Sequence, residues 1–263
     1  MGENYARQIA AARKRFGTNF LLFDSVCVII FGLQKVNALL FSPQDNLTLR
    51  VLRLFVGMFL AAFGISTITT AGLGTTPIST LPFVLAVLSG YSFGQTTFLV
   101  NVVFVIGQFM LLGRKLPWWN IFQLAAVFVF SAFIDLSMFL IAALKPEAWG
   151  GQLLMSLAGN LFLALGIVLQ ISSKTLVQPG EGIVLAIAVR LQRSFGDIKV
   201  RSDIVLVCLA AILGFGCSRS FIGLREGTLI SALLVGLLVK KIQGIDHKPA
   251  QLKEVSFQPN EKS

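Results

Sequence analysis

Long apolar runs, separated by short polar or basic stretches, dominate the chain from residue 51 to residue 241. We interpret six of these runs as membrane-spanning helices, at 51–71, 95–113, 118–144, 152–172, 200–218 and 226–241. Two shorter runs, at 77–89 and 182–193, would form helices of about 20 Å, which is short for a hydrocarbon core of about 30 Å. The pattern predicts an all-α, polytopic membrane protein in which one short helix follows the first full span of each half.

An interruption of the apolar pattern precedes each short helix. The first reads GLGTTP at 72–77, and the second reads QPGEG at 178–182. Irregular backbone is tolerated inside a bilayer only where protein buries it or where it lines a polar cavity. We therefore expect each interruption to break a helix or to start a re-entrant one, and to face protein or water rather than lipid.

The two interruptions are related by a constant shift along the chain. A shift of 102 residues, without a gap, places Pro77 on Pro179 and the triplet SFG at 92–94 on the same triplet in the second half. Apolar matches are common by chance in such a chain, but a proline and a triplet in one register are not. We infer an internal duplication with repeats at 46–145 and 146–243, as in many secondary transporters.

Residues 1–45 and 244–263 flank the two repeats. The first segment is basic, and Asp24 within its apolar part argues against a signal peptide. This part is either an extra span or a helix in the membrane interface. We favour the interface, because a span would put the basic clusters before and after it on opposite sides. The tail at 244–263 is polar and is predicted to be disordered.

Basic residues gather at the ends of the apolar runs and help to choose between two topologies. If the short helices re-enter, six spans form two inverted repeats, and both ends of the chain are cytoplasmic. If they cross, eight spans form parallel repeats, and three more basic residues move outside. The inverted arrangement fits the positive-inside rule better. It leaves only Lys145, Arg219 and Arg225 outside.

Composition agrees with a membrane protein and argues against several functions. The 263 residues are 55% hydrophobic and 13% charged, against about 25% charged in an ordinary soluble domain. The formal charge of +10 reflects membrane topology rather than nucleic-acid binding, because the basic residues lie at the ends of spans. The single histidine lies in the tail, the three cysteines lack metal-binding spacing, and no protease-type motif lies in a span. We expect no enzymatic activity, no metal and no cofactor.

Two motifs resemble a known family. The stretch GLGTTPISTLPFVLAVLSGYSFGQTTFLVN at 72–101 and the element GTLISALLVG at 227–236 are similar to the YczE-like branch of the YczE/YyaS/YitT integral membrane proteins. The resemblance covers about 50–241, whereas residues 1–45 and the stretch WWNIFQLAAVFVF at 118–130 depart from the pattern. It implies a bacterial inner-membrane protein with a transporter-like duplicated fold, and little about a substrate.

Polar groups at the two interruptions are the candidate solute-binding residues. Hydroxyls and free N–H groups at one break, facing a carboxylate at the other, could hold a solute between the halves. The candidate set is Thr75, Thr76, Pro77, Ser79, Gln178, Glu181 and Arg201. The alternative is that the hydroxyls only satisfy backbone groups freed by the break, and that Glu181 only caps a helix.

Charged groups within spans are costly and are therefore candidates for ion coupling. We consider Glu181, Asp135 and Asp203 for this role, with Glu181 as the principal charge. Arg201 could pair with Glu181 or with a solute. The alternative is that its side chain extends to the membrane interface. For Asp135, an interfacial position near the end of its span is an equal alternative.

The remaining polar and small residues within spans are assigned to helix packing and interhelical hydrogen bonds. These are Gly57, Gly64, Gly107, Gly159, Gly166, Gly236, Gln108, Gln123 and Gln170.

Taken with the duplication, these features favour a secondary transporter or exporter of a small organic solute. No nucleotide-binding motif occurs, so an ion gradient or a partner ATPase would supply the energy. The alternative is a non-transporting membrane scaffold or regulatory component, which the scarcity of charge in the spans supports. The expected partners are the lipid bilayer and a small-molecule solute, without nucleic acid, and a homo-oligomer is left open.

Overall fold

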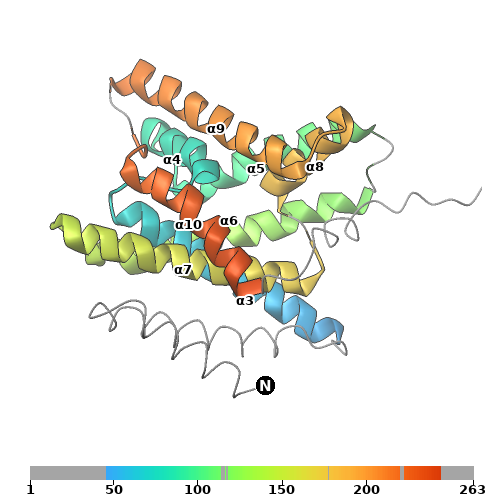
Figure 1. Ribbon diagram of the computed structural model, residues 1–263, viewed down its shortest axis with the longest axis horizontal. Coiled ribbons are helices and arrows are strands. Elements are labelled where there is room, and N and C mark those ends of the chain that lie inside the picture. The colour runs from blue at the N-terminus through green and yellow to red at the C-terminus, as the bar shows by residue number, and fades with distance from the viewer. Residues whose placement is uncertain (1–45, 114–115, 117, 177, 220–221, 244–263) are drawn as a thin grey trace, which may run out of the picture.

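The computed structural model describes residues 46–243 apart from 114–115, 117, 177 and 220–221. All regular structure in this part of the chain is helical, as predicted (Figure 1). The predictions for 1–45 and 244–263 concern residues outside the described part.

Each half of the described part of the chain contributes four α-helices. The first half forms α3 (Leu47–Thr70), α4 (Pro77–Ser89), α5 (Phe93–Leu112) and α6 (Gln123–Ile141), with the short 3-10 helices η2 (Trp118–Phe122) and η3 (Ala142–Leu144) flanking α6. The second half forms α7 (Trp149–Ser173), α8 (Pro179–Leu191), α9 (Phe195–Ser218) and α10 (Glu226–Gln243).

Five of the described helical segments are long and apolar enough to cross a membrane, namely α3, α5, α6 with its flanking turns, α7 and α9. They correspond to five of the six predicted spans. The sixth prediction, 226–241, coincides with α10, which is a helix but is not among these five. Its last turn carries Lys240 and Lys241, which shorten its apolar part.

The centre of the fold is the contact between α3 and α7. A Cβ atom at Gly64 would lie 2.7 Å from the carbonyl oxygen of Gly159, and one at Gly166 would lie 2.6 Å from that of Gly57. The four glycines therefore allow the two backbones to touch, as predicted. Gly236 differs, because no atom of the described residues lies within 4 Å of a Cβ built there, so these residues give no support to its assignment to helix packing.

The pairing of these glycines also gives the direction of the helices. Gly57 meets Gly166 and Gly64 meets Gly159, so residue numbers rise along α3 as they fall along α7. The two helices lie side by side and run in opposite directions (Figure 1). The inverted six-span arrangement requires this antiparallel contact, whereas eight spans in parallel repeats would make α3 and α7 parallel.

The other helices are arranged around this central pair. α6 packs on α3, and α10 packs on α7. The short helices α4 and α8 each pack against both α5 and α9, so these four helices form a ring beside the centre. α4 and α8 have 13 residues each, and both begin at a proline. The duplication predicts this correspondence but itself remains a prediction, which superposition of the two halves would test.

Contacts at the helix ends lead to a topology prediction. Nε of Arg50 donates a hydrogen bond to the carbonyl of Ser173 (2.8 Å), so the start of α3 and the end of α7 lie at one membrane face. In the inverted arrangement this face is cytoplasmic, and Lys145 lies outside. With the native cysteines replaced, Lys145→Cys should react with a membrane-impermeant maleimide in intact cells, and Lys174→Cys should react only after permeabilisation. Labelling of position 174 alone in intact cells would show the reverse orientation.

Candidate functional site

The first turns of the two short helices meet inside the protein. A Cβ atom at Gly180, in the first turn of α8, would collide with the side chain of Ile78, in the first turn of α4. Each helix starts at a proline, Pro77 or Pro179, whose restricted φ and missing N–H suit the first helical position. The stretch at 178–182, predicted as a loop, is therefore helical from Pro179 onward.

The loop before α10 closes the first interruption. The N–H of Gly227 donates to the carbonyl of Leu73 (2.8 Å), and the guanidinium of Arg225 donates to the carbonyl of Gly72 (2.8 Å). Backbone groups freed by the break are thus paired with protein, as burial in a membrane requires.

Hydroxyls at this interruption pair with one another. The hydroxyl oxygens of Thr69 and Thr75 lie 2.8 Å apart, as do those of Thr76 and Ser79. Thr75 is fully buried, and Thr76 and Ser79 are nearly so. These contacts agree with the alternative interpretation, in which the hydroxyls only satisfy hydrogen-bonding groups at the break.

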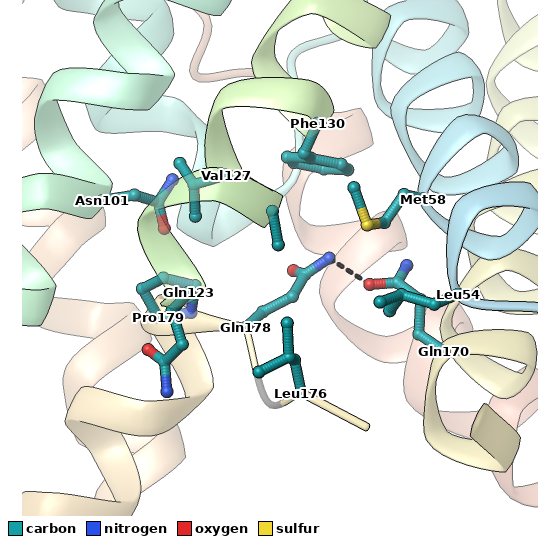
Figure 2. A pocket seen from close by; sticks show the side chains of 11 residues that line it. Leu54, Met58, Asn101, Gln123, Val127, Phe130, Gln170, Leu176, Gln178 and Pro179 are labelled. Carbon is teal, nitrogen blue, oxygen red and sulfur yellow. Dashed lines mark hydrogen bonds between the residues drawn. The ribbon is translucent and has the colours of Figure 1, made fainter. Parts of the chain in front are cut away.

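Amide side chains surround the second interruption instead. Gln178 donates through Nε2 to Oε1 of Gln170 (Figure 2), and Gln170 donates to the carbonyl of Gly57 (3.1 Å). Gln108 reaches across from α5 and donates to the carbonyl of Pro179 (3.2 Å). The predicted interhelical hydrogen bonds of Gln108 and Gln170 are confirmed, and both now hold the segment that leads into α8.

A small cavity lies among these amides, between α3, α5, α6 and the start of α8. Its polar wall includes Asn101, Gln123 and Gln178, and its apolar wall includes Leu54, Met58 and Phe130 (Figure 2). The centres of water molecules can occupy about 30 Å³ of it, enough for about two waters in the present conformation. Uncharged donors and acceptors opposite apolar and aromatic groups are typical of sites for small molecules.

The candidate residues are divided between this cavity and its surroundings. Gln178 lines the cavity, whereas Thr75, Thr76, Ser79 and Glu181 are not among its lining residues. The two interruptions are in contact through Ile78 and Gly180. The cavity lies at the second interruption. In the sequence, the cavity was indicated by several glutamines within spans, which we interpreted as packing residues.

Glu181 belongs to a group of charges on α8 and α9. It interacts electrostatically with Lys199 and Asp203, and Nζ of Lys199 lies 2.7 Å from Oδ1 of Asp203. The structure thus brings together two of the three predicted ion-coupling carboxylates and adds Lys199, which the sequence argument missed. The i, i+4 spacing of Lys199 and Asp203 was the available signal. Arg201 is exposed.

Asp135 holds the start of α5. Its carboxylate accepts hydrogen bonds from the hydroxyl of Ser92 (2.6 Å) and from the N–H of Gly94 (2.7 Å). Ser92 in turn caps α5 through the N–H of Gln95 (3.1 Å). Two hydrogen bonds at a helix N-terminus give Asp135 a structural role, since a carboxylate there satisfies free N–H groups.

Comparison with known proteins assigns the chain to a family. Residues 48–244, which include both interruptions and the cavity, match the family described as a family of unknown function, DUF6198. The chain belongs to this family.

The DUF6198 chain also resembles a curated protein. It is 25% identical over 199 residues to the "Uncharacterized membrane protein YczE" of Bacillus subtilis (strain 168), a match that covers 75% of this chain and 86% of that protein. No solved structure matches the chain. The resemblance inferred from the GLGTTP and GTLISALLVG motifs is confirmed, and this DUF6198 member is a multi-pass bacterial membrane protein.

Proposed function

We propose that this DUF6198 protein is a secondary transporter or exporter of a small organic solute, which binds in the amide-lined cavity. The observation that carries the proposal is the meeting of two short helices at Ile78 and Gly180, directly beside the cavity wall at Pro179. Transporters place solutes where discontinuous helices from two halves of the chain converge.

The chemistry of the cavity supports an uncharged or zwitterionic solute. Gln123, Gln178 and Asn101 offer both donors and acceptors without net charge, and Phe130 and Met58 offer an apolar surface. Because the cavity has room for only about two water molecules in the present conformation, solute entry requires a rearrangement of its walls. α4 and α8 pack against the same two helices, α5 and α9, so a displacement of these helices would move both interruptions together.

Energy coupling is assigned to the charges beside the second interruption. Glu181, Lys199 and Asp203 carry two negative charges and one positive charge, when all are ionised, on helices that pack against each other. Such a group can take up a proton or a cation without leaving a net positive charge in the membrane.

The test is a binding screen followed by transport. Purified protein is screened for thermal stabilisation by a library of neutral and zwitterionic metabolites, and each stabilising compound is then tested for uptake into proteoliposomes. Gln178→Leu should abolish stabilisation and uptake, because it removes the amide from the cavity wall. Gln152→Leu is the matched control, since Gln152 bonds the carbonyl of Pro146 and does not line the cavity.

The screen also addresses the alternative function. Stabilising solutes that enter proteoliposomes only with intact Gln178 would support transport. If no compound stabilises the protein and none is taken up, a scaffold or regulatory component becomes the better explanation.

A further inference from the structure

Among the described residues, three buried side chains on α7 and α10 carry polar atoms without a partner. Ser156 and Asn160 are fully buried and Ser231 is 1% exposed. Within the described part of the chain, no hydrogen-bond partner is found for Oγ of Ser156, Oδ1 of Asn160 or Oγ of Ser231. An unsatisfied buried polar atom costs about 1–3 kcal/mol, so several of them in one region require an explanation.

Contacts at both ends show that α7 and α10 lie side by side and run in the same direction. At one end, Gln152 of α7 and Gly227 of α10 both adjoin the interruption at 72–73. At the other end, Val168 and Ile242 pack in one cluster.

This alignment places the unpaired groups at one depth. Ser231 follows Gly227 by one helical turn, and Ser156 follows Gln152 by one turn, so the two serines are level with each other. Asn160 lies one turn further along α7, on the same face as Ser156, because residues four apart share a face.

The face of α7 that carries these residues lies between α3 and α10. Gly159, next to Asn160, would bring a Cβ atom to within 2.9 Å of the N atom of Ile68 on α3. Ala164, one turn after Asn160, packs in a cluster with Ile242 of α10. By this register, the unpaired groups of α7 and that of α10 face the interior of the bundle, beginning about one helical turn from the first interruption.

The orientation of Asn160 determines which ligand fits. Its Nδ2 donates to the carbonyl of Ser156 (2.7 Å), and a carbonyl can only accept, so Oδ1 is the atom left unpaired. Asn160 thus presents an unpaired acceptor, besides the second N–H of its amide, and the two hydroxyls can also accept. Unpaired acceptor oxygens at one place attract a cation rather than an anion.

The donor set also selects among cations. No group of three or more His, Cys, Asp or Glu that could hold a metal is found among the described residues. Divalent calcium and magnesium are usually bound with the help of carboxylates, and transition metals by nitrogen or sulfur. In membrane transporters, backbone carbonyls at the unwound part of a broken helix coordinate sodium. The neutral amide and hydroxyl oxygens here begin about one helical turn from such a break.

We propose that Asn160, Ser156 and Ser231 form a binding site for a sodium ion between α3, α7 and α10. The register of the 102-residue shift provides a second argument. In that register Ser156 and Asn160 correspond to Leu54 and Met58, which line the amide cavity beside the second interruption. The same positions thus face the solute cavity in one half and carry the unpaired oxygens in the other.

The experiment measures thermal stability of the purified full-length protein in detergent, without any solute. Sodium chloride is titrated against potassium chloride and choline chloride at constant ionic strength. The melting temperature should rise saturably with sodium and stay unchanged with the other two salts. In Asn160→Leu and Ser231→Ala, the sodium concentration for half of this shift should rise by about tenfold or more, as expected for one lost ligand to a charged group.

Ser131→Ala is the matched control. Ser131 also carries an unpaired buried hydroxyl, but it lies on α6 where that helix meets Gly94 of α5. Its removal should leave the response to sodium unchanged. If Asn160→Leu does not fold, the nearly isosteric Ser231→Ala is the variant that tests the site.

Two results would overturn the proposal. Equal melting temperatures of the wild type in sodium, potassium and choline would mean that the three oxygens hold water or nothing. A wild-type response to sodium in both Ser231→Ala and Asn160→Leu would place the ion elsewhere. Because no solute is present, either result is independent of whether the protein transports one.

Discussion

Replacing Gly64 with alanine is expected to leave the protein misfolded or too unstable to purify. A Cβ atom there would lie 2.7 Å from the carbonyl oxygen of Gly159 and 2.8 Å from Cα of Leu163. Both are backbone atoms, so no side-chain rotation can relieve the clash, and α3 would have to move away from α7. Overpacking a dense interior costs about 1–3 kcal/mol, and a clash between backbones belongs at or above the upper end of that range.

The measurement is the yield and melting temperature of the detergent-purified protein. Gly166→Ala should have the same effect, because Gly166 makes the corresponding contact with Gly57 and Ala61. Gly236→Ala is the control, since its Cβ would meet no atom of the described residues within 4 Å and alanine favours a helix interior by up to about 1 kcal/mol. A wild-type melting temperature for Gly64→Ala would show that α3 and α7 are not in backbone contact.

Replacing Glu181 with glutamine is expected to reduce solute uptake to background while leaving the fold intact. Glutamine keeps the shape of the side chain and an oxygen at the start of α8, but it removes the charge that interacts with Lys199 and Asp203. If that charge couples an ion to solute movement, the variant should still bind solute and fail to accumulate it.

The measurement compares solute binding and gradient-driven uptake in the same preparation. Glu226→Gln serves as the control, because Glu226 is exposed and pairs with Arg225 (3.2 Å) at the start of α10, away from α8. Unchanged uptake in Glu181→Gln would mean that Glu181 only caps α8, and that the coupling group lies elsewhere.

The sequence predicted the helices well wherever a strong local signal marked a boundary. Pro77 follows a glycine-rich stretch, and the predicted bounds of the short helix that it opens, 77–89, are those of α4. The start of α8 was placed three residues late, because the two glycines around Glu181 resembled a loop. Pro179 already provided the start signal, since proline at the first helical position needs no hydrogen bond from its nitrogen.

The candidate site was predicted less well, because its residues are neutral and its geometry is long-range. Gln170 and Gln178 have the same appearance in a sequence whether they bond a neighbouring helix or line a cavity. Only the fold brings Asn101 of α5 and Gln123 of α6 to the same cavity. Asn160 gave no signal at all, because an unpaired atom is recognised only when its neighbours are known.

The contact between α3 and α7 has a consequence for synthesis of the chain. Gln170 bonds the carbonyl of Gly57, 113 positions earlier. At about 5–20 residues per second, α3 waits roughly 6 to 23 seconds in the bilayer before its partner is complete. α3 is the most buried of the five spans in the finished protein, so during this interval it exposes its glycine surface to lipid and to other nascent helices. A chain whose synthesis stops between α6 and α7 therefore keeps the glycine surface of α3 without its partner helix in the membrane.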